Sequence, residues 1–455
     1  MLFYCLVAFI IGLSMESETQ LMCVRCGFRL DEVRYVDRCP QCGGLLVPTF
    51  TGSLRRTGDS GVWVWGRALY TAFMRPKVTL GEGHTPLTKS TRIGRSLKAN
   101  LYFKDESKNP TGSFIDRGAA TLATALRYFR VRSISVASTG DLGISVSTYV
   151  RRVGLTTRIY VPSSVTLSKA YKTLLTGGKV RFVDSYEEAL LRASRAVKLY
   201  GAMIPPSHPY LMDGYRTIAF EILHELSGKK PLNLVVPIGD GVLTMSLYQA
   251  FKDLNVRPKF LGVKACRESP LLREIYVMKP MLHEYLEEIA SLGILEIVDV
   301  CDDEALEASE LTIKNEGFLV GPVGASCIAA LLKAGPEAVR GKVTVALMTG
   351  DPLQDPYIMK ALLERTAGTR EELLTLGFTK TKILEMLAYG DPTHPYMIWK
   401  GLRSRYGLSV SRRTVYKHVE ELIDAGLLKV VSYKKVGGRL RKVISITESG
   451  LRYLT

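Results

Sequence analysis

The chain lacks an N-terminal apolar run long enough to cross a bilayer. The apolar stretch from Leu2 to Leu13 has twelve residues, whereas a spanning helix needs about 20. It also lacks the basic flank and the small-residue cleavage site of a secretion signal. The sequence therefore predicts a cytoplasmic protein without a membrane partner. Residues 1–21 are expected to be an over-extended start or an untethered leader.

Cysteine and acidic residues are also scarce. The 455 residues include eight cysteines, four in two close pairs and four scattered. That pattern is not a disulfide scaffold and is typical of a reducing compartment. Lys and Arg number 61 against 44 Asp and Glu, giving a formal charge of +17. Such an excess calls for an anionic partner, an anionic ligand or a basic subdomain. The length allows two or three domains.

The two close pairs are Cys23/Cys26 and Cys39/Cys42, with twelve residues between the pairs. Each pair places two thiolates on a tight turn, and two such turns make a tetrahedral cage for zinc. Disulfides and an iron site of the rubredoxin type are the alternatives. Four protein ligands close the metal shell, so the predicted zinc has a structural role.

The region after residue 100 alternates between strand and helix patterns, which predicts an α/β fold with parallel sheets. Strands are expected over 101–104, 133–137, 157–161 and 179–183, and helices over 116–129, 143–153, 167–175 and 186–199. A second run has strands over 232–238, 259–263 and 342–348, and helices over 241–251, 305–316 and 325–332. Two α/β units with a cleft between them are therefore expected.

Three loops follow predicted strands, and the patterns of the first two could bind ligands. Ser138-Thr139-Gly140-Asp141 opens a helix whose backbone amides can hold an anion. Gly239-Asp240-Gly241-Val242 is a glycine turn, where converging N–H groups can cradle a phosphate. Thr349 follows the last strand of the second run. Each pattern alone is also compatible with an ordinary turn.

Residues 109–118 form a further strand–loop–helix junction and read Asn-Pro-Thr-Gly-Ser-Phe-Ile-Asp-Arg-Gly. This stretch resembles the motif of threonine synthase and the wider fold-type-II family of pyridoxal-phosphate (PLP) enzymes, matching nine of ten positions. The position that differs is Ile115, where the family has the lysine that forms a Schiff base with PLP. An alkyl side chain can neither form that bond nor carry a proton. No catalytic residue is therefore predicted.

The resemblance extends from about Cys23 to Pro356. It includes the Leu80–Leu87 loop, the segment from His208 to Ile222, and the end of the cysteine-rich segment, where one branch of threonine synthases has a similar ribbon. It implies a two-domain PLP fold of type II. Several motifs in the same order make the likeness specific.

The resemblance also implies a role for each of the three loops. Ser138, Thr139 and Gly140 correspond to the loop that binds the substrate carboxylate. Asp141 stands where the family has an asparagine that bonds to the PLP ring oxygen, and Gly239, Asp240, Gly241 and Val242 stand in the phosphate loop. Thr349 matches the threonine that bonds to the pyridine nitrogen. Asp141, Asp240 and Asp351 add acid where PLP brings negative charge, which makes PLP binding doubtful.

The C-terminal part predicts a different fold. Helices are expected over 379–388, 396–406 and from Arg412 onward, with a cap at Ser411, followed by strands over 428–433 and 443–446 and a turn at 437–438. This order, with a Ser-x-x-Thr-Val-x-x-His-Val third helix, resembles winged helix-turn-helix transcription regulators. Between Lys400 and Lys442 there are twelve Lys/Arg and three Asp/Glu. Duplex DNA is the expected partner, and a protein-docking winged helix is the alternative.

The third helix would read bases through Arg412, Arg413, Thr414 and Lys417, and the wing would meet phosphates through Arg439 and Arg441. A symmetric operator would require a homodimer. The predicted organisation is a leader (1–21), a zinc ribbon (22–50), a threonine-synthase-like domain (51–366), a linker (367–378) and a winged helix (379–455).

Two functions are compatible with this organisation. The first is a transcriptional regulator that senses a small amino-acid-like ligand in a domain without PLP catalysis. The second is a PLP-dependent threonine synthase, which converts phosphohomoserine to threonine, or a related lyase. The enzyme would need another amine in place of residue 115. Lys104 and Lys108 are near in sequence but match no catalytic position.

Overall fold

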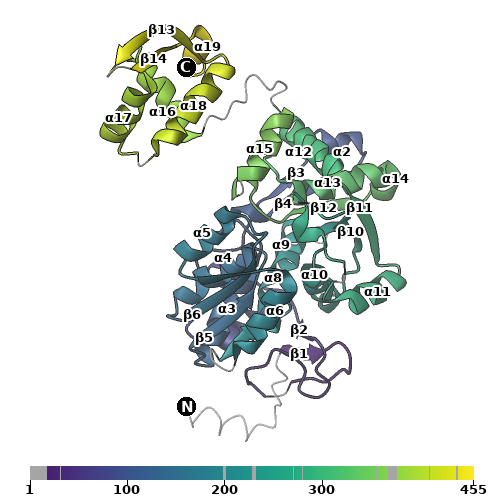
Figure 1. Cartoon of the computed structure of the whole chain (residues 1–455). Helices are drawn as coiled ribbons and strands as arrows, with labels where there is room; N and C mark the ends of the chain where they lie inside the picture. The colour runs from purple at the N-terminus through teal and green to yellow at the C-terminus, as the bar shows by residue number, and fades with distance from the viewer. Residues whose placement is uncertain are drawn as a thin grey trace, which may run out of the picture. The chain divides into compact units, whose positions relative to one another are not determined.

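The computed structural model describes residues 18–30, 32–197, 201–227, 232–269, 271–278, 280–354, 356–366, 377–408, 410–436 and 439–454. The chain forms two compact units, Met1–Thr366 and Ala367–Thr455 (Figure 1). Most of the predicted leader and linker lies outside the described residues, as do Ser409 and the turn at 437–438. Among the helices that the structure describes, none has the length and apolar character needed to cross a bilayer.

The first unit contains a six-stranded sheet in the order β11-β10-β9-β12-β4-β3. Its strands are β3 (Leu87–Lys89), β4 (Asn100–Asp105), β9 (Leu232–Pro237), β10 (Lys259–Ala265), β11 (Leu295–Val300) and β12 (Val343–Met348). All neighbours are parallel except β3, which runs antiparallel to β4. Every residue of β9 and β12 is buried. Continuous apolar strands of this kind are typical of parallel sheets covered on both faces.

A second, four-stranded parallel sheet has the order β7-β6-β5-β8. It consists of β5 (Ser133–Ala137), β6 (Thr156–Pro162), β7 (Lys179–Val183) and β8 (Ala202–Ile204). The predicted α/β class with parallel sheets is therefore confirmed. The grouping of one strand was wrong: 101–104 was expected in the first run, yet β4 lies in the six-stranded sheet between β12 and β3. Sequence order does not determine sheet membership, because β4 pairs with a strand that comes much later in the chain.

The helices of the first unit pack around these sheets. The expected ones are α3 (Ile115–Tyr128), α4 (Asp141–Arg151), α5 (Leu167–Leu175), α6 (Tyr186–Arg195), α10 (Val242–Asp253), α12 (Asp302–Glu316) and α13 (Pro322–Ala334). Helices α8 (Pro209–Tyr215), α9 (Thr217–Glu225), α11 (His283–Ser291) and α15 (Pro356–Thr366) were not individually predicted. Helix α3 packs closely on α8 at Gly118, where only a glycine fits. A Cβ at this position would lie 2.5 Å from the ring of Tyr215.

The cysteine-rich segment is built on β1 (Thr19–Cys23) and β2 (Leu46–Phe50), which pair antiparallel. It is fastened to the rest of the first unit at several points. The Tyr35 hydroxyl lies 3.1 Å from Nε2 of buried His208, and the backbone N–H of Phe50 donates to Asp253 at 2.8 Å. Burial lowers the pKa of His208 to about 3, so this imidazole is neutral in the folded protein.

One disulfide departs from the expectation drawn from the scattered cysteines. Cys266 and Cys301, at the ends of neighbouring β10 and β11, are joined. Their Cα atoms are 5.2 Å apart, because the parallel register brings the two strand ends together. Sequence spacing alone gives no sign of this proximity.

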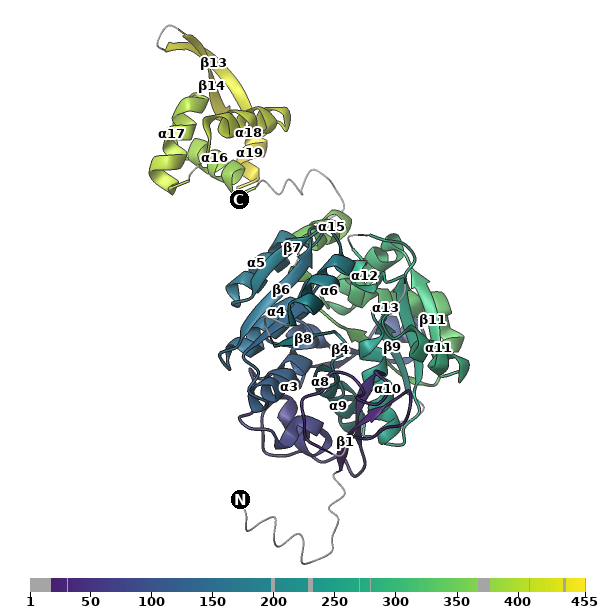
Figure 2. The ribbon, with the colours of Figure 1, turned by 60° about the horizontal axis from the view of Figure 1, so that its bottom comes forward.

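The second unit has the predicted order of three helices and two strands: α16 (Phe378–Ala388), α17 (Pro395–Tyr406), α18 (Arg412–Asp424), β13 (Leu428–Val436) and β14 (Arg439–Ile446), followed by α19 (Glu448–Arg452). The Ser411 side chain accepts from the N–H of Thr414 at 3.1 Å and caps α18. Both strands are longer than expected. Figure 2 shows the β13–β14 hairpin extending beyond the three helices.

Candidate functional site

A cavity of about 220 Å³ lies where both sheets direct loops and helix starts. Its lining includes Ile115, Ser138, Thr139, Asp141, Gly239, Asp240, Gly241, Val242 and Thr349. The structure thus gathers most of the predicted ligand-site residues around one space. Gly140 is the exception, since it lies beneath the side chain of Lys169: a Cβ at Gly140 would be 2.4 Å from Cδ of that lysine.

Ile115 begins α3 and lines the cavity. The loop before it is held against the end of β12, because the N–H of Phe114 donates to the carbonyl of Thr349 at 3.2 Å. The motif therefore places residue 115 beside the ligand space, and that residue offers only an alkyl group.

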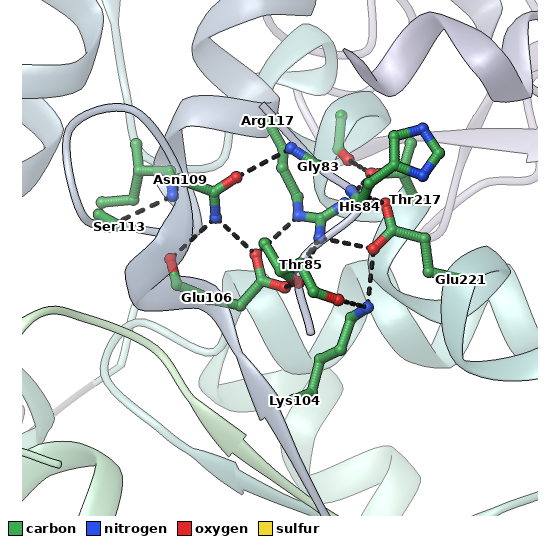
Figure 3. Close-up of polar contacts among 12 residues, drawn as sticks. Gly83, His84, Thr85, Lys104, Glu106, Asn109, Ser113, Arg117, Thr217 and Glu221 are labelled. Atoms are coloured by element: carbon green, nitrogen blue, oxygen red, sulfur yellow. Dashed lines mark hydrogen bonds and ion pairs between the residues drawn. The ribbon is translucent and has the colours of Figure 1, made fainter. Parts of the chain in front are cut away.

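Two other residues of the motif, Asn109 and Arg117, belong to a buried network of charges and hydrogen bonds (Figure 3). The guanidinium of Arg117 pairs with Glu106 and Glu221, each at 2.6 Å. Burial alone would raise the pKa of Glu221, but Arg117 and Lys104 outweigh it and lower that pKa. The side chain of Asn109 accepts from the N–H of Gly83 at 2.9 Å and so ties the loop at residues 80–87 to the network. These motif residues serve the fold.

Neither lysine near the motif in sequence lines the cavity. Lys104 is fully buried and donates to Glu221 at 2.8 Å and to Glu225 at 3.1 Å. Lys108 is exposed and lies 3.6 Å from Asp105. Neither can substitute for the missing amine at position 115.

The one lysine among the described lining residues is Lys169 on α5, which sequence reasoning missed. Its ammonium lies 2.9 Å from Asp141 and also pairs with Glu274. Burial would lower the pKa of Lys169, but the two carboxylates outweigh it and raise that pKa. This lysine is therefore held protonated, which is the wrong state for a nucleophilic amine.

This ion cluster also corrects the view of Asp141 as an uncompensated charge. Asp141 begins α4, where the helix end favours a carboxylate, and Lys169 balances it. Glu274 belongs to η4 (Arg273–Ile275), beyond β10 of the other sheet. No local pattern predicts this meeting, because the three residues come from three separate elements.

The glycine turn is shaped by the chain's own packing. A Cβ at Gly239 would lie 2.5 Å from the carbonyl oxygen of Glu274, and one at Gly241 would lie 2.8 Å from Leu286. The Asp240 carboxylate accepts from the N–H of Met281 at 3.4 Å, and burial raises its pKa. Close contacts within the chain therefore explain why glycine is required at both positions, without a phosphate bound in the turn.

The lining as a whole does not fit PLP in the manner that the resemblance implies. Among the described lining residues, Lys169 is accompanied by four carboxylates, those of Asp141, Asp240, Glu274 and Asp351. PLP brings a phosphate and a phenolate oxygen, which such a lining repels. Thr349 is in place to meet a ring nitrogen, but the amine that would anchor the ring is absent.

The four paired cysteines converge as expected. The Sγ atoms of Cys23, Cys26, Cys39 and Cys42 all lie within 4.8 Å of one another. Those of Cys23 and Cys42 are 3.5 Å apart, and those of Cys26 and Cys39 are 3.7 Å apart. Tetrahedral zinc with Zn–S bonds of about 2.3 Å requires spacings of about 3.8 Å. The donor set therefore fits zinc, and its closed shell fits a structural role.

The residues expected to contact DNA differ in their surroundings. Arg413, Thr414 and Lys417 are exposed on the first turns of α18. Arg412 instead lies over the ring of Trp399 at 4.5 Å, and Arg441 lies over Tyr396 at 5.3 Å. Arg439 begins β14, and its side chain lies outside what the structure describes. Arg412 lies in the first turn of α18, as expected, with its guanidinium over a ring of α17.

Comparisons with known proteins agree with the architecture of the first unit. The family model described as "Pyridoxal-phosphate dependent enzyme" matches residues 78–350. Threonine synthase of Methanosarcina acetivorans is 28% identical over 74% of this chain and 92% of its own length. That of Methanocaldococcus jannaschii is 29% identical over 73% and 92%. These alignments span nearly all of the relatives' length.

Solved structures show the same fold at lower identity. A processed threonine deaminase isoform 2 from Solanum lycopersicum has a TM-score of 0.51 and 21% identity, covering 70% of this chain and 98% of its own. An O-ureido-L-serine synthase has a TM-score of 0.54 and 18% identity, covering 63% and 94%. With a family model that spans most of the chain and this shared fold, the chain belongs to the pyridoxal-phosphate-dependent enzyme family.

Proposed function

We propose that this chain is a DNA-binding transcriptional regulator in which the PLP-enzyme-type domain senses a small amino-acid-like ligand without turning it over. The observation that carries the proposal is Ile115, which leaves the cavity without a reactive amine. The only lysine described in the lining is occupied by two carboxylates. The cavity therefore supports binding better than Schiff-base chemistry.

The second unit supplies the support for DNA binding. Its three helices and hairpin follow the order of a winged helix, and α18 is capped by Ser411 and has an exposed basic first half. In this fold the third helix enters the major groove and the wing reaches the backbone. A homodimer would place two such units on a symmetric operator.

Zinc at the four cysteines would hold the N-terminal segment together, and the cytoplasm is the expected compartment.

In this proposal the ligand takes the cavity where the family holds its cofactor. Ser138 and Thr139 line the cavity next to the start of α4 and offer their hydroxyl groups to a ligand. An amino-acid-like molecule has the small size and the mixed charges that this lining accommodates. Ligand binding would then alter DNA binding by the full chain.

A PLP-dependent threonine synthase or related lyase is the second candidate, because the relatives named threonine synthase align with about three quarters of the chain. That function needs a lysine that can bond to the cofactor. Lys169 is the one described lining residue with an amine, and it would first have to leave Asp141 and Glu274.

Two measurements on the purified full chain separate the candidates. A mobility shift on genomic fragments, at low and at physiological salt, should show DNA binding. Added PLP should give no aldimine absorption and no borohydride-stable adduct. A reducible adduct that maps to Lys169 together with threonine formation would establish the enzyme and overturn the sensor. Absence of DNA binding even at low salt would overturn the regulator.

A further inference from the structure

Two aromatic rings of α17 form a plate in the second unit. The ring centroids of Tyr396 and Trp399 are 5.6 Å apart, and the rings are tilted by 37°. The indole N–H of Trp399 donates to the carbonyl of Val410 at 2.9 Å, which fixes this ring beside the start of α18. The plate is therefore a rigid feature at the junction of α17 and α18.

Three arginines from three elements lie over this plate. Arg412 of α18 is 4.5 Å from the Trp399 centroid and 5.2 Å from that of Tyr396. Arg441 of β14 is 5.3 Å from Tyr396, and Arg403 of α17 is 5.2 Å from Trp399. Helix α17 itself, the third helix and the hairpin thus each place a guanidinium group against these two rings. We call this set of residues the arginine plate: Tyr396, Trp399, Arg403, Arg412 and Arg441.

The basic residues of the second unit fall into two groups, those with a described carboxylate partner and those without one. Lys442 pairs with Glu420 at 3.1 Å, and Lys380 pairs with Glu421 at 2.9 Å. Among the described ion pairs, none joins a carboxylate to one of the three arginines of the plate. Glu420 and Glu421 of α18 are thus paired with lysines, while the described contacts of the three arginines are with aromatic rings.

This arrangement gathers like charges at a cost that a bound anion would relieve. Guanidinium groups that share one ring repel one another. The imidazole of His394 stacks against Tyr396, with centroids 6.2 Å apart, and its pKa is lowered first by burial and then by the charge of Arg441.

We propose that the arginine plate is a binding site for a backbone phosphate of duplex DNA, and that Tyr396 and Trp399 are positioning residues for it. The proposal rests on the DNA-binding function proposed above. A guanidinium that lies flat on a ring keeps its N–H edge free, and that edge matches a phosphate in bidentate geometry. Arg412 therefore joins Arg441 in phosphate binding and leaves base contacts to residues such as Arg413.

The test is the salt dependence of DNA binding by the full chain, measured between 50 and 200 mM salt. Each lost phosphate contact reduces the slope of log K against log salt by about 0.9, which makes the fall in affinity over this range about 3.5-fold smaller. Arg412→Gln and Arg441→Gln should each have this effect. Tyr396→Leu should reduce the slope by about one to two units, because both arginines lose their support.

Controls separate this role from a loss of fold or of charge. Tyr396→Phe keeps the ring and should retain the wild-type slope. Arg340→Gln removes one charge from an exposed position in the first unit and should also leave the slope unchanged. Circular dichroism melting checks that Tyr396→Leu remains folded.

The outcomes for this site and for the function are distinct. If wild type binds DNA but Tyr396→Leu and Arg412→Gln retain its salt slope, the plate is not a phosphate site and the DNA-binding function stands. If wild type binds no DNA, both proposals fail. A reduced slope in Tyr396→Leu that Tyr396→Phe restores supports the plate.

Discussion

Arginine is used in two different ways in the two units. Arg117 of the first unit is fully buried and paired with Glu106 and Glu221. Arg412 of the second unit is exposed, rests on aromatic rings and has no described carboxylate partner. A charge that the protein neutralises itself stabilises the fold, whereas a charge left without a counter-ion is available to a ligand.

The same contrast applies to the four paired cysteines. Four cysteine sulfurs within 4.8 Å of one another form a site that a cation would complete, since cysteine binds zinc as the thiolate, just as an anion would complete the arginine plate. The cavity is neutralised in part, because Lys169 balances some of the negative charge of the four carboxylates in its lining. Disruption of these sites should have effects that decrease from the cysteine cluster through Arg117 and His208 to the arginine plate.

The largest effect is expected at the cysteine cluster. Cys39→Ser should lower bound zinc from about one per chain to none and unfold the N-terminal segment locally, since zinc binding contributes on the order of 10 kcal/mol to such segments. Elemental analysis and proteolysis of that segment measure this. Cys327→Ser, at a buried thiol outside the cluster, should retain the metal. Metal-free wild type purified under reducing conditions would contradict the prediction.

Removal of Arg117 should have the next largest effect. Arg117→Leu leaves Glu106 and Glu221 buried without their partner, which should lower the free energy of unfolding by about 3–5 kcal/mol. Urea unfolding measures this change. In a Glu106→Gln background the same substitution should cost less, because only one carboxylate is left unpaired. Equal costs in the two backgrounds would show that the pairing is not what stabilises the network.

A fall in pH should destabilise the packing of the cysteine-rich segment on the rest of the first unit, because buried His208 lies at this contact. Its pKa is about 3 in the folded protein and about 6.5 when unfolded, so the unfolded state binds more protons between these values. Stability is complete above pH 6.5 and is lost as pH falls. From pH 6.5 to pH 5 the loss should be about 2 kcal/mol. Urea unfolding at both pH values measures this loss, which should be absent in His208→Gln. An equal loss of unfolding free energy in wild type and variant would exclude His208 as the titrating group.

The smallest effect on stability is expected at the arginine plate. Arg412→Ala removes an exposed cation–π contact, which should cost less than about 1 kcal/mol in thermal unfolding. Its effect on DNA binding should nevertheless be measurable. A loss of stability similar to that of Arg117→Leu would mean that Arg412 serves the fold, and the contrast between the two units would disappear.

Local patterns predicted most of the architecture. Apolar periodicity located seven of the ten strands in the two sheets and missed β3, β8 and β11. The capping residue Ser411 located the start of α18. Cysteine spacing located the thiolate cluster, because its ligands lie on short turns. The departure at Ile115 was visible because a single residue carries the chemistry of that position.

Contacts between residues that are far apart in the sequence could not be predicted from these local patterns. Lys169 and Glu274 reach the cavity from different sheets, and neither lies in a motif. The disulfide between Cys266 and Cys301 depends on the register of β10 and β11. Arg412 was assigned to base contacts because helix position suggested it, but the rings of α17 determine where its side chain lies.

The position of β4 in the six-stranded sheet affects how the protein is made. Asn100 of β4 pairs with Val343 of β12. This edge of β4 therefore has no partner strand until β12 leaves the ribosome. At about 5–20 residues per second the wait is on the order of 10–50 s. During that time the apolar residues of β4 and β9 have no neighbour between them. A nascent chain that stalls before β12 therefore carries two unpaired strand edges that invite aggregation.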